Sequence, residues 1–166
     1  MSILEIWNSD VIRWHASRSH ALRNSGDTTD AHAARCCRLL LALKPDASAN
    51  LIAATLHHDV AERVTGDTPW GAKIDDATLR DVLGRLETAE NDRLGLSTPR
   101  HDEDVQWIKL VDRLDAYLWC AMVAPAQLRL TDWDGAYCDI LDRATMLGVL
   151  DDVGPVLSVA NSGGLQ

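Results

Sequence analysis

The chain has 166 residues, of which 46% are hydrophobic, and its formal net charge is −9. This length is typical of a single domain with a real core, which we expect over residues 1–160, with a flexible tail at 161–166. The acidic balance argues against a protein that coats nucleic acid or an anionic membrane, since both need a basic face, although one metal-containing pocket can still attract a small anion.

The predicted elements are helices throughout, and we expect an all-α bundle of about six to seven of them. No run of alternating β-branched residues or Asn-Gly hairpin signal occurs along the chain. Polar segments at 15–28 and 66–73 predict the two longer loops. Periodicity and the positions of proline and glycine predict helices over about 3–14, 29–43, 48–64, 75–94, 102–123, 132–147 and 150–160.

The second predicted helix carries a histidine on its apolar face. His32 shares this face with Cys36 and Leu40, at i, i+4 and i+8. His32 is therefore expected to point inward near the helix start, which Thr28 or Thr29 can cap. For this helix alone, the alternative is a core histidine that is bonded to a backbone carbonyl.

The third predicted helix brings three polar groups together beside its apolar stripe. At about 100° per residue, His58, Asp59 and Glu62 share one arc of the helix. Such a group is costly to bury unless something positive compensates it, and a solvated polar face is the alternative. The apolar stripe itself is predicted at i+4 steps: Ile52, Leu56, Val60 and Val64.

The helix predicted at 102–123 places Asp112 and Asp115 on one face, between apolar residues. An aspartate near a core needs a metal, an arginine or several N–H donors. The alternative to a metal is a buried pair with Arg113 or Arg129. Taken together, the three helices direct two imidazoles and two carboxylates inward, and these groups suit a divalent cation that keeps open coordination positions. Mixed nitrogen and oxygen ligands favour Mn, Co, Fe, Ni or Zn over Mg.

In this order, the residues match the H…HD…D metal motif, and the chain resembles the HD-domain phosphohydrolases over roughly residues 10 to 125. The likeness is closest to the small bacterial HD-domain 5′-deoxynucleotidases, and the dATP triphosphohydrolases of phages are similar in shape. It rests on "IRWH" near the N-terminus, "HHDVAERVTGDTPWGAK" in the middle and "KLVDRLDAYLWC" in the helix with the last aspartate.

The resemblance implies an HD-domain fold and a role for each matching residue. One metal would be held by His32, His58, Asp59 and Asp112. Glu62 would orient or deprotonate the attacking water, and Asp67 would assist at the reacting phosphate or the leaving oxygen. The substrate would be held by Arg13 on phosphate, Trp14 against the sugar and Lys73 as a second phosphate contact. The alternatives are a surface role for Arg13 and a core role for Trp14.

The implied function is hydrolysis of a small deoxynucleotide by a homo-oligomer in the cytoplasm of a bacterium, or of a host cell if a phage encodes it. Removal of phosphate from deoxynucleoside monophosphates is the first candidate, and removal of triphosphate from a dNTP, with dATP expected, is the second. A regulatory HD module that binds nucleotide without catalysis and a purely structural bundle are the alternatives. All four cysteines, Cys36, Cys37, Cys120 and Cys138, are expected to be reduced thiols in or near the core, which suits the cytoplasm, and the absence of a C-x-x-C pair argues against a zinc ribbon. A signal peptide pattern and a membrane-spanning apolar run are also lacking.

Overall fold

The computed structural model describes residues 3–13 and 20–163, which form an all-α helical bundle. Over these residues no strand forms, and an isolated bridge pairs Ile12 with Thr28. No helix in the described part of the chain has the length and apolarity that a membrane span needs. The helices are α1 (Ile3–Trp7), α2 (His20–Arg23), α3 (Thr29–Leu43), α4 (Ala49–His57), α5 (Glu62–Thr65), α6 (Trp70–Asp75), α7 (Ala77–Leu94), α8 (Asp102–Val123), the 3₁₀ helix η1 (Pro125–Arg129), α9 (Thr131–Met146) and α10 (Leu150–Asn161).

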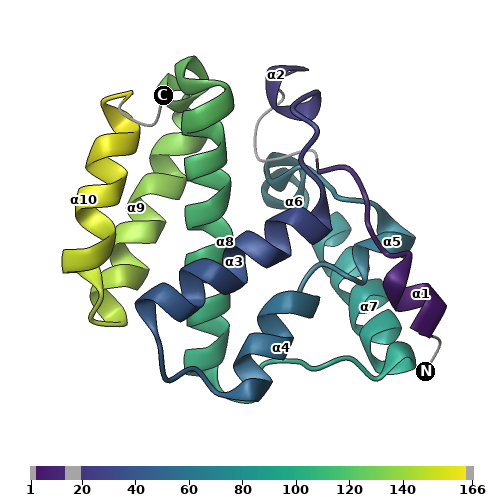
Figure 1. The fold of residues 1–166 in the computed structure, drawn as a ribbon. Helices are drawn as coiled ribbons and strands as arrows, with labels where there is room; N and C mark the ends of the chain where they lie inside the picture. Colours follow the sequence, from purple (N-terminus) through teal and green to yellow (C-terminus); the bar gives the residue numbers. More distant parts are fainter. Residues whose placement is uncertain (1–2, 14–19, 164–166) are drawn as a thin grey trace.

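Helix α8 is the axis of the bundle. It packs against α3, α4, α9 and α10, and in Figure 1 α9 and α10 stand beside it on one side while α3 crosses it. The helix buries a continuous apolar face, and α3, α9 and α10 add Leu40, Ile140 and Leu157 to the same core. This core fixes the middle of α8 against the N-terminal half of α3. The buried face of α8 includes Leu110, Val111, Leu114, Tyr117 and Cys120.

On the other side of α3, the helices α5, α6 and α7 pack on one another (Figure 1). Helix α1 is attached to this group by charge, since the Glu5 carboxylate lies 2.9 Å from Nη2 of Arg93. Arg93 and Arg63 both bind the carboxylate of Glu90, which lies on α7. The cluster formed by Glu5, Arg63, Glu90 and Arg93 therefore links α1, α5 and α7.

The long predicted helices agree with the structure to within about two residues at each end, but the predicted helix 3–14 is wrong beyond Trp7. Residues 11–13 instead run antiparallel to residues 27–29. The N–H of Arg13 donates to the carbonyl of Asp27 at 3.1 Å, and Thr29 donates its N–H to Val11 at 3.0 Å. The extended segment carries Arg13 across the start of α3, and Trp14 lies outside the described residues.

The predicted helix 48–64 is also wrong, because the chain turns between α4 and α5. Nδ1 of His58 lies 2.7 Å from the carbonyl oxygen of Thr55, which an uninterrupted helix would use for the N–H of Asp59. The backbone tightens into i to i+3 bonds, such as Glu62 N–H to the Asp59 carbonyl at 2.9 Å. Two residues of the predicted apolar stripe, Leu56 and Val64, are therefore exposed and not buried. The predicted loop 66–73 is also wrong in part, because the short helix α6 begins within it.

Candidate metal centre and adjoining cleft

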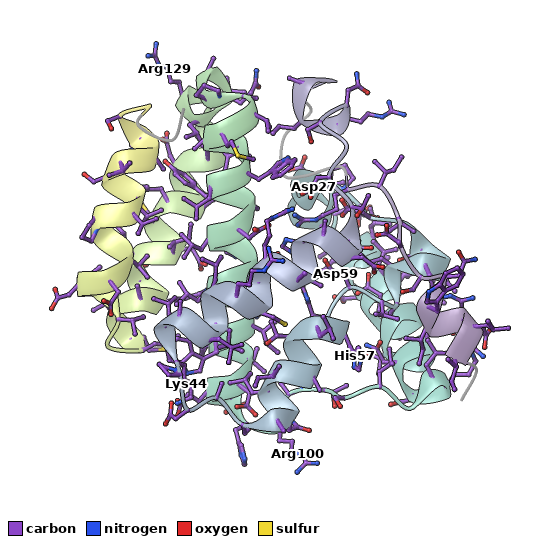
Figure 2. The ribbon with its side chains drawn as sticks, viewed as in Figure 1. Asp27, Lys44, His57, Asp59, Arg100 and Arg129 are labelled. Atoms are coloured by element: carbon purple, nitrogen blue, oxygen red, sulfur yellow. The ribbon has the colours of Figure 1, made fainter. Side chains whose placement is uncertain are left out.

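Four side chains that the sequence predicts as metal ligands converge at the start of α3. His32, near the start of α3, directs Nε2 at Nε2 of His58, in the turn after α4, across 3.2 Å. The Asp112 Oδ1 atom, from the middle of α8, lies 3.1 Å from Nε2 of His32. Asp59 brings Oδ2 to 3.6 Å from Nε2 of His32 and 3.3 Å from Nε2 of His58. Figure 2 labels Asp59 where the turn after α4 approaches α3.

The opposite ring nitrogens have acceptors of their own. His32 Nδ1 lies 2.6 Å from Oδ2 of Asp115, and His58 Nδ1 lies 2.7 Å from the carbonyl oxygen of Thr55. A carbonyl only accepts, so His58 carries its proton on Nδ1, and the Asp115 carboxylate favours the same tautomer of His32. Both Nε2 lone pairs then face each other and two carboxylates, which is stable only with a proton or a cation between them.

The spacing of these atoms fits a bound cation. A metal bonded at about 2.1 Å places neighbouring ligand atoms about 3.0 Å apart in octahedral geometry and about 3.4 Å apart in tetrahedral geometry. Three of the four separations given above, 3.1, 3.2 and 3.3 Å, lie within this range, and the fourth, 3.6 Å between His32 and Asp59, slightly exceeds it. The histidine nitrogens also have the outer hydrogen-bond partners that metal-binding histidines commonly use. The residues present are therefore compatible with a divalent transition metal.

A proton can occupy the same position in the cation-free protein. Burial and the charge of Arg13 oppose protonation of His32, but hydrogen bonds to Asp112 and Asp115 outweigh them and raise its pKa well above the ordinary value. Burial likewise opposes ionisation of Asp112, yet its hydrogen bond to His32 lowers its pKa overall. A cation and a proton on His32 would therefore compete for one place.

Cys36 is the third member of a close group with His32 and His58. Its Sγ atom lies 3.6 Å from both ring nitrogens of His32, so it sits beside the ring and not in line with the Nε2 lone pair. The thiol donates towards the carbonyl of Val111, and burial raises its pKa to about 12. Cys36 is accordingly a buried thiol, as the sequence predicts, and Asp59 and Asp112 are the better-placed ligands.

A cleft of about 230 Å³ opens beside the converging ligands. It contains each predicted catalytic or substrate residue that the structure describes, and it adds basic and apolar residues from α8 and α9 that the sequence does not single out. The lining residues are Arg13, Asp59, Glu62, Asp67, Thr68, Lys73, Lys109, Asp112, Arg113, Ala116, Trp133 and Ala136.

Glu62 is a buried carboxyl in this cleft, with 7% of its surface exposed. One oxygen, Oε1, lies 3.6 Å from Nζ of Lys73, while Oε2 has no hydrogen-bond partner among the described residues. Burial, followed by the charges of Asp59 and Asp67, raises the pKa of Glu62 to about 9. Lys73 also approaches Glu87 at 3.8 Å, so this lysine bridges two acids in the absence of a substrate.

Arg13 is held from one side and faces the ligands with the other. Its Nη1 lies 3.4 Å from Oδ2 of Asp27, and its Nη2 lies 3.7 Å from Oδ1 of Asp112. The Nε atom is buried and has no hydrogen-bond partner among the described residues. Burial opposes its charge, but Asp59 and Asp112 outweigh burial and raise its pKa further. Arg13 is therefore a permanent positive charge at the edge of the cluster.

The sequence missed the residues that support this site. Asp115 does not pair with Arg113 or Arg129 but with His32 and Arg35, whose Nε donates to Oδ1 of Asp115 at 2.7 Å. Arg113 binds Asp139 at 2.8 Å, and Figure 2 shows Arg129 far from Asp59. The spacing of Arg35 could have predicted that it lies near His32, because it follows His32 by three residues, about one turn of α3.

Two imidazoles, two carboxylates and a nearby arginine could thus hold a divalent cation and an anionic group side by side, next to a carboxyl that is hard to ionise. This arrangement suits hydrolysis of a phosphate ester or anhydride. Comparisons of the chain with protein-family models, with curated proteins and with solved structures find no match.

Proposed function

We propose that this protein is a metal-dependent phosphohydrolase of the HD-domain superfamily that acts on deoxynucleotides. The observation that carries the proposal is the convergence of His58, Asp59 and Asp112 on Nε2 of His32, each bringing one atom to within 3.1–3.6 Å of it beside the cleft. The H…HD…D order of these residues adds the resemblance to that superfamily. A purely structural bundle gives no reason for two imidazoles and two carboxylates to converge beside a cleft that also contains Arg13 and Glu62.

The four residues would hold one divalent transition metal, with Mn, Co, Fe, Ni or Zn favoured over Mg by the two imidazoles. When bound, such a cation supplies Lewis acidity, which lowers the pKa of water and neutralises phosphate charge. Asp115 and the Thr55 carbonyl keep the ring nitrogens of His32 and His58 in the tautomer that this role requires.

Arg13 would bind the phosphate, because its guanidinium offers a planar pair of donors that matches phosphate oxygens. Glu62 would orient the attacking water and accept its proton, since its Oε2 atom is unpaired in the cleft. A cation held by the ligand cluster would lower the pKa of Glu62 from about 9, in the direction that a general base at neutral pH needs. Asp67 would act near the leaving oxygen, and Lys73 would exchange its acidic partners for phosphate.

The substrate class has two candidates. The first is a deoxynucleoside monophosphate that loses orthophosphate, and the second is a dNTP, with dATP expected, that loses triphosphate. Product analysis separates them when the protein is incubated with Mn, Co or Zn and a panel of dNMPs, NMPs and dNTPs. Orthophosphate from dNMPs supports the first, and tripolyphosphate supports the second. His32→Ala provides the matched control for contaminating phosphatases.

The alternative of another class is a regulatory module that binds nucleotide without turnover. It predicts metal and nucleotide binding but no product with any substrate or metal in the panel. The proposal also includes a cytoplasmic homo-oligomer, and mass measurement in solution at several protein concentrations tests the oligomeric state. If His32→Ala hydrolyses the nucleotide as fast as the wild type, the proposed metal-dependent phosphohydrolase site is wrong.

A further inference from the structure

Two buried acids outside the ligand set are joined by one arginine. Asp27 and Asp115 have 1% and 3% of their surface exposed. Arg35, on α3, donates from Nη2 to Oδ1 of Asp27 at 2.7 Å and to Oδ2 of Asp115 at 2.9 Å. Its Nε donates to Oδ1 of Asp115 at 2.7 Å, so the contact with Asp115 is bidentate. The guanidinium thus fixes the distance between the two acids.

Each acid in turn holds one side chain of the proposed site. Asp115 places Oδ2 at 2.6 Å from Nδ1 of His32. Asp27 places Oδ2 at 3.4 Å from Nη1 of Arg13, and its carbonyl accepts the N–H of Arg13 at 3.1 Å. The chain of contacts therefore runs from the histidine of the ligand cluster to the arginine of the cleft, through Asp115, Arg35 and Asp27, and a longer ion pair of 3.9 Å also joins Oδ2 of Asp115 to Nη1 of Arg13. Figure 2 labels Asp27 beside the N-terminal end of α3.

Arg35 is itself held in place by neutral contacts. Its guanidinium lies over the ring of Trp119, 4.4 Å from the centroid. Trp119 donates Nε1–H to Oγ of Ser25 at 2.9 Å, and Ser25 donates its hydroxyl to the carbonyl of Leu22 at 2.6 Å. Stacking on one face and hydrogen bonds along its edge leave Arg35 little freedom to move.

We propose that Arg35, Asp27 and Asp115 are positioning residues that hold the His32 imidazole and the Arg13 guanidinium at a fixed separation. Asp115 acts on metal affinity through His32, Asp27 acts on phosphate affinity through Arg13, and Arg35 acts on both. The inference rests on the proposed function, because it assigns the network to a metal and a phosphate. If these residues formed only a structural ion cluster, substituting any of them would lower stability. It would not weaken metal binding at one residue and phosphate binding at another.

The test compares Asp115→Asn, Asp27→Asn and Arg35→Lys, with Arg38→Lys as the matched control. Arg38 lies three residues, about one helical turn, after Arg35 on α3, and its side chain is exposed. Calorimetric titration with Co²⁺ and the absorption spectrum of the Co²⁺ form report the metal site. Titration of the Co²⁺-loaded protein with inorganic phosphate reports the Arg13 side. Neither readout depends on turnover.

We expect Asp115→Asn to weaken Co²⁺ binding about 10- to 100-fold and to change the Co²⁺ spectrum. Asp27→Asn is expected to leave Co²⁺ affinity within about threefold and to weaken phosphate binding about tenfold, the loss of roughly one charge-assisted contact. Arg35→Lys keeps the positive charge but loses the planar set of donors that contacts both acids, so it should weaken both Co²⁺ binding and phosphate binding. Arg38→Lys should change neither.

Unchanged Co²⁺ affinity and spectrum in folded Asp115→Asn would overturn the inference while leaving the proposed function intact. Failure of the wild type to bind any divalent metal would overturn both. If a variant does not fold, nitrogen NMR of the histidine rings in the Zn²⁺-loaded wild type decides the question. A proton on Nδ1 of His32 supports the network, and a proton on Nε2 overturns it.

Discussion

His32 and His58 point their Nε2 atoms at each other across 3.2 Å, from helices that reach this point through different contacts. His32 is fixed by the core between α3 and α8, and His58 is fixed by a turn that its own ring creates at the Thr55 carbonyl. Because hydrogen bonds to Asp115 and to the Thr55 carbonyl hold the two rings, little side-chain freedom would be lost on binding a cation. This preorganisation leads to the first prediction.

Purified protein should contain about one equivalent of transition metal per chain after loading with Mn, Co or Zn. His32→Ala should lose it, because it removes the atom that all other ligands approach. Cys36→Ala is the matched control and should keep it, because the protonated thiol lies beside the ring. Elemental analysis after gel filtration measures both. Loss of metal in Cys36→Ala would mean that a thiolate, not an aspartate, completes the site.

Glu62→Gln should lower kcat about 10²- to 10⁴-fold, the usual contribution of a general base. Metal content should stay within about twofold of the wild type, because the Glu62 carboxylate is not among the four convergent groups. Glu87→Gln is the control, since Glu87 shares Lys73 with Glu62 but does not line the cleft. Equal losses in the two variants would assign the effect to Lys73 and would contradict the role of Glu62.

Arg13→Lys should raise KM for the nucleotide about 10- to 100-fold with a smaller change in kcat, because a lysine gives one point of contact where the guanidinium gives two. Steady-state kinetics at saturating metal measures the two constants separately. Arg100→Lys is the control, and Figure 2 shows Arg100 at the far end of the molecule from Asp59. A KM that Arg13→Lys leaves unchanged would place the phosphate elsewhere in the cleft.

The sequence predicted the parts of the site that depend on local periodicity. His32, Cys36 and Leu40 repeat at helical spacing, and all three are fully buried on one face of α3. The same reasoning failed at His58, since no periodicity indicates that a ring will take the Thr55 carbonyl and end α4. The continuous helix predicted over 48–64 therefore missed both the turn between α4 and α5 and the exposure of Leu56 and Val64.

The parts of the site that the sequence did not predict depend on contacts between distant parts of the chain. Arg35 binds Asp115, which lies 80 residues further along the chain. The position of Arg35, three residues after His32, does not indicate which acid it will bind. Arg13 reaches its site on an extended segment paired with residues 27–29, which is a pairing of two segments and not a property of either. Spacing therefore predicted which histidines and aspartates converge, but not the network of Asp27, Arg35 and Asp115 behind them.

The last prediction concerns the charge cluster that joins α5 to α7, away from the cleft. Hydrogen bonds from Arg93 outweigh burial and, with those from Arg63, lower the pKa of Glu90 from 4.5 to about 2. A depressed pKa in the folded state stabilises the protein above pH 4.5, and this contribution is lost as the pH falls towards 2. The free energy of unfolding of the wild type should therefore exceed that of Glu90→Gln by about 1 to 2 kcal/mol at pH 7, and the two should converge near pH 2.

Urea unfolding at pH 7, 4.5 and 3, followed by far-ultraviolet circular dichroism, measures this difference. Subtracting one free energy of unfolding from the other cancels the pH dependence of the titratable groups that both proteins contain. Asp46→Asn is the matched control, because it deletes the same charge from an exposed ion pair with Lys44 and should change stability by less than about 0.5 kcal/mol at any pH. A constant difference between wild type and Glu90→Gln from pH 7 to pH 3 would show that Glu90 contributes packing alone. A difference that shrinks as acid is added would show that the carboxylate charge of Glu90, bound by Arg63 and Arg93, holds α5 against α7.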